Sequence, residues 1–192
     1  MLDASVLFRL FKCDAIMALD AGLELHVATQ VHNEFSKGGP AERSILKKLK
    51  VIPHQVVPGT REWETFCLIR QRFSTRDLGE DESLAVCLAE ASRGHLLPFV
   101  TFDGKGTADA NSQGVVTLGF LELLSWLVEL GSLTLTEADT LEELAIVRNG
   151  WKRPTNYSGS LHTVEQQLRD RVIATVGEWK ARPTRVKRKR ER

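Results

Sequence analysis

Residues 96–104 read LLPFVTFDG, an apolar run from Leu96 to Phe102 that ends directly in Asp103-Gly104. A short apolar run that stops at turn residues is typical of a buried strand. Three further segments have the composition of strands: Leu23–Val31, Val51–Val57 and Gly114–Thr117. Pro53 lies within the second of these, so we expect that strand to be short or to lie at an edge of the sheet.

Helices are expected between these strands. In chain order they cover Ala4–Leu10, Ala41–Leu49, Thr60–Phe73, Leu84–Ala91 and Leu118–Leu130, with a last helix from Thr136 to about Val147. Gly131 is placed to end the fifth helix, and Thr136-Glu137-Ala138-Asp139 has the pattern of a capping box at the start of the last one. Strands that alternate with helices favour a parallel sheet covered on both faces. The predicted fold class is therefore α/β with a central parallel sheet.

We expect this α/β domain to extend over residues 1–150. Residues 151–160 contain Pro, Asn, Tyr and Gly and are typical of a linker, and Leu161–Trp179 has the apolar stripe of an amphipathic helix. Residues 185–192 are almost entirely basic, and we expect them to be disordered. The last 13 residues carry eight Lys or Arg against one acid, a net charge of +7, whereas the rest of the chain holds 18 bases against 24 acids, a net charge of −6.

Composition excludes several classes of protein. Apolar residues make up 42% of the 192 residues and charged residues 27%, which is an ordinary globular balance. No apolar run reaches the roughly 18 residues that cross a bilayer, and no secretory signal is apparent, so we expect a cytoplasmic protein without a membrane partner. Three cysteines without a CxxC pair, and five histidines without ligand spacing, argue against a disulfide scaffold or a zinc site.

Acidic residues recur where strands end or helices begin. Asp3 follows the first residues, Glu34 follows the strand Leu23–Val31, Glu80-Asp81-Glu82 precedes a buried helix, and Asp103 ends the strand quoted above. The carboxyl ends of parallel strands meet at one edge of a sheet, so these carboxylates are expected to lie close together. Clustered carboxylates repel one another unless a cation lies between them, and their oxygens suit Mg²⁺ or Mn²⁺. Taken singly, each acid is more simply a solvated charge or a helix-start residue.

Four segments together resemble the motifs of PIN-domain nucleases, in the same order and with similar spacing: Leu2-Asp3-Ala4-Ser5-Val6-Leu7, Val31-His32-Asn33-Glu34, Gly79-Glu80-Asp81-Glu82-Ser83-Leu84-Ala85 and Val100-Thr101-Phe102-Asp103. The resemblance covers about residues 1–131. It implies a three-layer α/β/α fold and a metal-dependent endoribonuclease that cleaves single-stranded RNA, commonly the VapC-type toxin of a toxin–antitoxin pair. Only Met1 and Leu2 precede the first acid, whereas the family usually has a longer first strand, so either the true start lies upstream or the first strand is stunted.

The resemblance also implies roles for individual residues. Asp3, Glu34, Glu82 and Asp103 would be catalytic and hold Mg²⁺ or Mn²⁺, with Glu80 the second candidate for the third acid and Asp81 the next. Ser5 and Thr101 lie two residues from an acid and are expected to support it through a hydroxyl hydrogen bond. Candidate contacts to RNA phosphates are Arg9, Lys12, Lys37, Lys105, Lys187 and Arg188.

Partners other than RNA would be an antitoxin protein or a second copy of the chain, for which the apolar segment Leu118–Leu130 offers a surface. Three alternatives remain open at this level. A PIN nuclease could process RNA without being a toxin, and a degenerate PIN domain could bind RNA or protein without cutting. A receiver-like phosphotransfer domain would need a lysine at a strand end, and none is evident in the sequence.

Overall fold

The structure is a computed structural model that describes residues 1–21, 23–72, 77–95 and 97–152. Its helices are α1 (Ala4–Lys12), the 3₁₀ helix η1 (Ile16–Leu19), α2 (Thr29–Ser36), α3 (Pro40–Lys48), α4 (Arg61–Arg72), α5 (Leu78–Arg93), α6 (Gly104–Ser112), α7 (Phe120–Glu129) and α8 (Leu135–Asn149). Its strands are β1 (His26–Ala28), β2 (Ile52–His54), β3 (Phe99–Val100) and β4 (Thr117–Leu118). The expected linker, amphipathic helix and basic tail of residues 153–192 lie outside the described residues.

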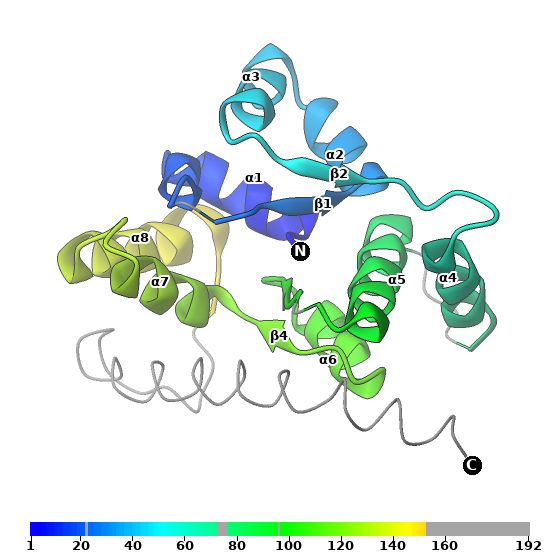
Figure 1. The fold of residues 1–192 in the computed structure, drawn as a ribbon. Helices are drawn as coiled ribbons and strands as arrows, with labels where there is room; N and C mark the ends of the chain where they lie inside the picture. Colours follow the sequence, from blue (N-terminus) through cyan, green and yellow to red (C-terminus); the bar gives the residue numbers. More distant parts are fainter. Residues whose placement is uncertain (22, 73–76, 96, 153–192) are drawn as a thin grey trace.

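The strands form two parallel pairs, which confirms the predicted α/β class. β1 pairs with β2, and β3 pairs with β4. Leu2 connects the pairs because it forms parallel bridges to Val27 of β1 and to Val100 of β3. The order across the strands is therefore β2, β1, Leu2, β3, β4, and Figure 1 shows the N-terminus between β1 and β4. The expected first strand is reduced to this one residue.

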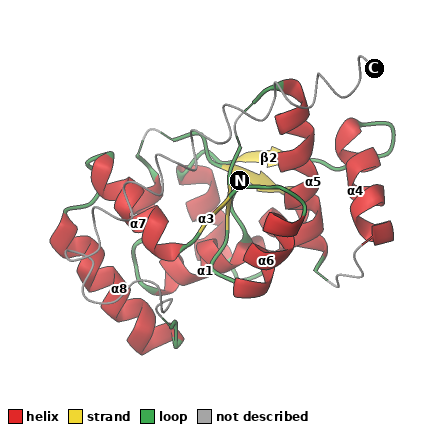
Figure 2. Cartoon of the chain, turned by 90° about the horizontal axis from the view of Figure 1, so that it is seen from below, coloured by secondary structure: helices red, strands yellow, loops and turns green. Residues whose placement is uncertain are grey.

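Alternate residues of the strands pack into two different apolar clusters. Leu2, Val27 and Val100 belong to a cluster formed mainly with α1, α2, α7 and α8. Met1 and Phe99 belong to a second cluster, formed mainly with α5. In both ribbon views α7 and α8 lie on one side of the start of the chain, and α4 and α5 lie on the other (Figures 1 and 2).

The strands are shorter than the sequence suggested, because helices begin earlier. The expected strand Leu23–Val31 is a strand only over β1, and α2 begins at Thr29 because Val31 and Phe35, spaced by one helical turn, both pack into the core. Glu34 therefore lies on a helix and not at a strand end. β2 pairs only with β1, which confirms the edge position expected from Pro53, and no ladder hydrogen bond is lost inside the sheet.

Two helical boundaries also differ from expectation. The polar stretch after Asp103, where no helix is predicted from the sequence, forms α6, which buries Ala110 and is capped by the Asp103 carboxylate. The capping box at the start of α8 is formed by Thr134 and Glu137, not by Thr136 and Asp139.

Other helix predictions are confirmed. α5 is buried over most of its length, and Gly131 takes a positive φ of 71° directly after α7. Most apolar side chains of α7 lie in the core, which explains their character without a partner. Across the described ranges, none of the helices is long and apolar enough to span a bilayer.

Candidate active site

Asp3 lies where the chain leaves the centre of the strand order. The strands that follow Leu2 in sequence are added first on one side, as β1 and β2, and later on the other, as β3 and β4. Ligands of parallel α/β sheets bind at the carboxyl ends of strands near such a switch point. Asp3 is also the N-cap of α1 and is only 9% exposed. The first predicted acid is thus buried at the position where a ligand site is expected.

Two hydroxyl groups hold the Asp3 carboxylate. Ser5 Oγ donates to Asp3 Oδ2 over 2.5 Å, and Thr101 Oγ1 donates to the same oxygen over 2.9 Å. Burial raises the pKa of Asp3, while these two hydrogen bonds lower it. Both residues that the sequence singled out as supporting hydroxyls therefore contact the first acid.

Thr101 also places the fourth predicted acid. The backbone N–H of Asp103 donates to Thr101 Oγ1 over 3.2 Å. The exposed Asp103 carboxylate accepts a hydrogen bond of 3.0 Å from the backbone N–H of Lys105 and so caps α6. β3 ends at Val100, so Asp103 is a helix cap beyond the strand and not its last residue.

The three consecutive acids at the start of α5 point in three directions. Glu80 is buried, and its Oε1 has no hydrogen-bond partner. Asp81, whose side chain is 0% exposed, forms an ion pair of 2.8 Å with Arg70 on α4. Glu82 Oε2 accepts a hydrogen bond of 3.0 Å from the backbone N–H of Gln30 in the first turn of α2. Successive helical residues are turned by about 100°, so neighbouring acids on a buried helix face different surroundings.

Among the three acids of α5, Glu80 is the one that interacts electrostatically with other predicted acids. Burial, together with the charges of Asp109, Asp77, Asp3 and Asp103, raises the pKa of Glu80 to about 7. Each of these four charges is a carboxylate, so they act on Glu80 in the same sense. Glu80, and not Glu82, therefore interacts electrostatically with Asp3 and Asp103.

Glu34 and Glu82 lie at the margin of this group. Burial raises the pKa of Glu34, as do the charges of Asp77 and Asp3, while a hydrogen bond from Gln30 lowers it. Burial likewise raises the pKa of Glu82, the hydrogen bond from the Gln30 backbone lowers it, and Glu34 is the charge that raises it further. The Glu34 carboxylate therefore interacts electrostatically with Asp3 and Asp77, whereas Glu34 is the charge that acts on Glu82.

Asp77 and Asp109 are members of the group that the sequence did not reveal. Asp77 is the N-cap of α5, where its side chain accepts from the Glu80 backbone N–H over 3.0 Å. Asp109 is on α6, which the polar, glycine-containing sequence concealed. A usable signal was Asp103 itself, because an aspartate that caps a helix predicts that the following residues, including Asp109, are helical.

Two glycines allow close packing beside the acids. A Cβ atom on Gly106 would lie 3.3 Å from Thr101 Oγ1 and 3.5 Å from Glu80 Cδ. A Cβ atom on Gly79 would lie 3.1 Å from Val31 Cγ2 and 3.4 Å from Glu34 Oε1. The close contacts are those with Thr101 and Val31, so an alanine at either position would require these neighbours to shift slightly.

The predicted basic residues are placed unevenly. Arg9 lies over the ring of Phe102, with its guanidinium carbon 5.4 Å from the ring centroid, and its Nη1 is buried without a hydrogen-bond partner. Lys37 is close enough to lower the pKa of Glu34. Lys12 and Lys105 have exposed side chains on α1 and α6. Lys187 and Arg188 lie outside the described residues.

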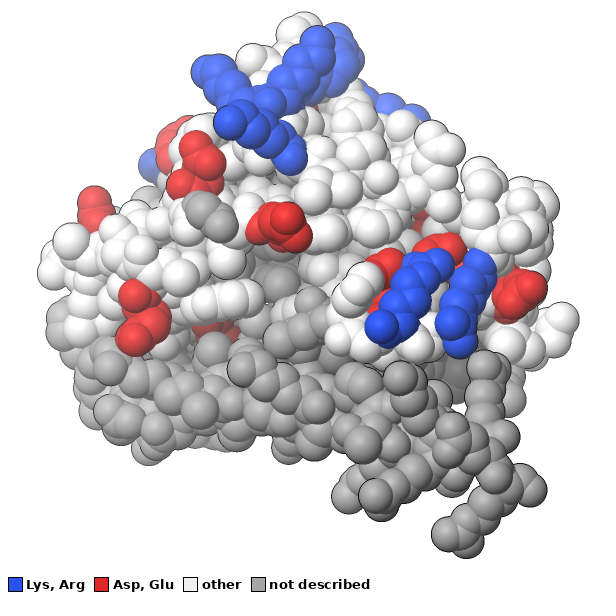
Figure 3. All heavy atoms as spheres, in the orientation of Figure 1, with Lys and Arg blue, Asp and Glu red and all other residues white. Residues whose placement is uncertain are grey.

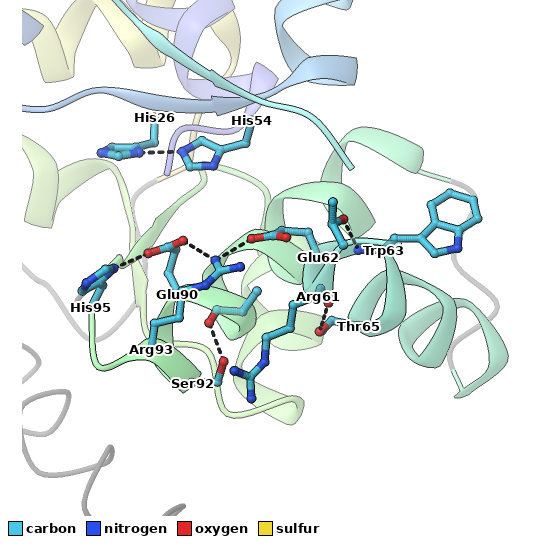
Figure 4. Close-up of polar contacts among 12 residues, drawn as sticks. His26, His54, Arg61, Glu62, Trp63, Thr65, Glu90, Ser92, Arg93 and His95 are labelled. Carbon is cyan, nitrogen blue, oxygen red and sulfur yellow. Dashed lines mark hydrogen bonds and ion pairs between the residues drawn. The ribbon is translucent and has the colours of Figure 1, made fainter. Parts of the chain in front are cut away.

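A second polar group, unexpected from the sequence, lies beside β1 and β2 (Figure 4). The rings of His26 and His54 share a hydrogen bond of 2.7 Å between Nδ1 and Nε2. Below them, Arg93 on α5 forms ion pairs with Glu62 on α4 and with Glu90 on α5. Burial lowers the pKa of both histidines, which favours the neutral rings that such a hydrogen bond needs. These contacts tie α4 to α5 and β1 to β2.

Comparison with known proteins adds no further constraint on the site. Within the described ranges, no group of three or more His, Cys, Asp or Glu side chains is arranged to hold a metal ion. A scan against models of protein families found no match, and searches of curated proteins and of solved structures also found none.

Proposed function

We propose that this chain is a PIN-like, metal-dependent endoribonuclease in which Asp3, Glu80 and Asp103 form the centre of the active site. The observation that carries the proposal is the position of Glu80, a carboxyl group whose pKa is raised by its burial and by the charges of four aspartates. Buried groups with strongly perturbed pKa values concentrate at functional sites. The strand order around Leu2 and the two apolar clusters support a three-layer α/β/α arrangement with this site at its switch point.

The carboxylate chemistry of these residues suits a divalent cation, and binding one would require their side chains to move together, because the described structure does not group them as a metal site. Glu80 Oε1 is buried without a hydrogen-bond partner, and the nearest strong charges are carboxylates. A cation between like charges removes the repulsion that otherwise disfavours ionised Glu80. We therefore assign Asp3, Glu80 and Asp103 as ligands, with Glu34 and Asp109 completing the set. Mg²⁺ or Mn²⁺ would supply Lewis-acid chemistry there, activating water and offsetting charge on the scissile phosphate.

The protein groups around the cation have separate tasks. Ser5 and Thr101 hold Asp3 Oδ2 in one orientation, so that carboxylate is positioned before any ligand arrives. Thr101 also fixes the backbone at Asp103 through its N–H. Glu80, with a pKa of about 7, releases its proton near neutral pH when a cation binds.

Single-stranded RNA is the substrate we propose, in the biological setting of a toxin that an antitoxin protein restrains. A homodimer belongs to the same proposal. The apolar side chains of α7 are mostly buried in the core, so α7 is not the surface that we assign to either partner.

Cleavage of labelled single-stranded RNA with Mg²⁺ or Mn²⁺, set against cleavage in EDTA, tests this function. Wild-type protein should cleave only with the metal, and Asp3→Asn, Glu80→Gln and Asp103→Asn should each abolish cleavage. Glu64→Gln, a change of an exposed carboxylate on α4, is the matched control. Cleavage in EDTA, or full activity of all three site variants, would contradict the proposal.

A further inference from the structure

A hollow lies between α2 and α3, away from the acids. It has a volume of about 380 Å³ and is lined by His32 and Ser36 of α2, Arg43, Leu46 and Lys47 of α3, and Lys50 and Val51 beyond it. Figure 3 shows lysine and arginine side chains gathered over α3 at the top of the view. The hollow is thus a basic pocket in a protein whose body, residues 1–179, carries a net negative charge.

The positive charges of this pocket are not neutralised by carboxylates. Arg43, Lys47 and Lys50 form no ion pair with any residue that the structure describes. Arg93, by contrast, pairs with two glutamates. The acid of α3, Glu42, lies against the Gly38 turn, where its Oε1 would be 2.6 Å from a Cβ atom on that glycine. A ligand that neutralises the pocket must come from outside the described residues.

Hydrogen-bond donors of the pocket are already positioned. Arg43 Nη1 donates to the Ser36 carbonyl oxygen over 3.1 Å, which fixes the guanidinium across the α2–α3 junction. Ser36 Oγ is buried and has no hydrogen-bond partner. Lys50 takes a positive φ of 51°, a conformation that is uncommon for a residue with a side chain. Arginine, lysine and serine donors around one hollow are the groups that bind phosphate oxygens.

We propose that this pocket binds a backbone phosphate of the RNA strand whose cleavage we propose at the acids. The inference rests on the proposed function and names a subsite for its substrate. Glu34 is two residues from both His32 and Ser36 on α2, a rotation of about 200°, so the pocket and the acids lie on opposite sides of one helix. An RNA strand that crosses α2 would reach both the pocket and the acids. A phosphate bound in the pocket would then fix which phosphodiester bond lies at the acids.

The test measures RNA binding without cleavage. Fluorescence anisotropy of a labelled single-stranded RNA is recorded in EDTA for the full-length wild-type chain, Lys47→Gln and Lys48→Gln. Lys48 is the matched control because it is the next residue of α3, is exposed and does not line the pocket. Loss of one charge-assisted contact should weaken binding about tenfold for Lys47→Gln. It should also lower the slope of log Kd against log salt concentration by about 0.7, while Lys48→Gln has a much smaller effect.

Arg43→Gln provides a second variant, for which the same loss is expected and thermal melts verify folding. The proposed phosphate subsite is overturned if Lys48→Gln weakens RNA binding as much as Lys47→Gln, because the lysines would then contribute only a nonspecific electrostatic attraction. It is overturned equally if no variant changes binding, or if uridine monophosphate competes as well as the RNA strand does. The binding assay is run in EDTA and does not depend on cleavage. Absence of cleavage in the separate Mg²⁺ assay would therefore contradict the proposed nuclease activity without affecting the binding result.

Discussion

The hydroxyl of Thr101 donates a hydrogen bond of 2.9 Å to Oδ2 of Asp3, a residue 98 positions earlier in the chain. The Thr101 hydroxyl oxygen in turn accepts the backbone N–H of Asp103 over 3.2 Å. One buried side chain therefore links the first and the last of the predicted acids. A hydroxyl with a donor and an acceptor role at once cannot be replaced by an apolar group of the same shape without leaving a polar atom unpaired.

Thr101→Val should therefore lower the free energy of unfolding by about 1–3 kcal/mol, because Asp3 and the Asp103 N–H lose a partner in a buried place. It should also raise the Mn²⁺ concentration needed for cleavage, since Asp3 is no longer held. Urea unfolding and a metal titration of RNA cleavage measure the two effects. Thr117→Val, at a buried threonine of β4, is the control; an equal rise in its metal requirement would contradict a specific role for Thr101.

The raised pKa of Glu80 predicts a pH dependence of stability. The group titrates near 4.5 in the unfolded chain and near 7 in the folded one, so between these values the folded protein binds more protons. The contribution of Glu80 is therefore most favourable below about pH 4.5 and is lost as the pH rises towards 7. Glu80→Gln should be more stable than wild type above pH 7, and the difference should vanish at low pH. Denaturant unfolding across this pH range measures the stability difference between each variant and wild type, with Glu64→Gln as the reference. A difference for Glu80→Gln that does not change with pH would contradict a raised pKa of Glu80.

A divalent cation should reverse the destabilisation. A ligand that binds only the folded state stabilises it by RT ln(1 + [L]/Kd), about 2.7 kcal/mol at 100 times Kd. Mn²⁺ should raise the Tm of wild-type protein at pH 8, and EDTA should return it to its starting value. Glu80→Gln and Asp3→Asn should show little of this shift. An equal shift in both variants would place the cation elsewhere in the protein.

Substitution of Glu82 should affect the stability of the protein and not its cleavage activity. Its carboxylate accepts the Gln30 N–H in the first turn of α2, so Glu82→Met should cost about 1–2 kcal/mol of stability through loss of this cap. Cleavage per folded molecule should remain near the wild-type value, whereas Glu80→Met should abolish it. Circular-dichroism melts and initial cleavage rates provide the comparison. The reverse pattern would restore Glu82 as the third acid.

The ion pair between Arg70 and Asp81 supports the packing of α4 on α5. Because Asp81 is fully buried, Arg70→Met leaves a charge without its cation and should cost about 3 kcal/mol. Arg61→Met, which removes an exposed cation from the first turn of the same helix, should cost much less. Denaturant unfolding distinguishes the two variants. A decrease of less than about 1 kcal/mol in the free energy of unfolding for Arg70→Met would mean that the ion pair contributes little to stability.

The sequence predicted the alternation of helices and strands, because buried apolar runs and turn residues record it directly, but it placed the ends of the strands too late. The helix over Ala4–Leu10, the edge position of Pro53 and the stunted strand before Asp3 are each confirmed. Boundaries were less accurate where helix and strand compete, as at Val31, whose β-branched side chain favours a strand but whose burial follows the helical period with Phe35. Tertiary packing decided that segment.

Site residues were harder to separate, for a geometric reason. Glu80, Asp81 and Glu82 are equivalent in composition, and only the rotation of α5 against its neighbours decides which one faces the aspartates. A helix that is buried on every side has no polar face that would reveal its orientation. The motif order therefore led to Glu82, whereas burial and the charges of the aspartates favour Glu80.

The single residue that joins the strand pairs has a consequence for how the protein opens. Leu2 N–H donates to His26 on one side, and Asp3 N–H donates to Val100 on the other, so few backbone bonds connect the halves. One apolar cluster contacts both strand pairs, and we expect local opening to begin at these few backbone bonds. Amide hydrogen exchange of Leu2, Asp3 and Val100 should therefore be faster than global unfolding permits. It reports the same event that separates Asp3 from Glu80, and a bound cation, by bridging the two halves, would slow this local opening.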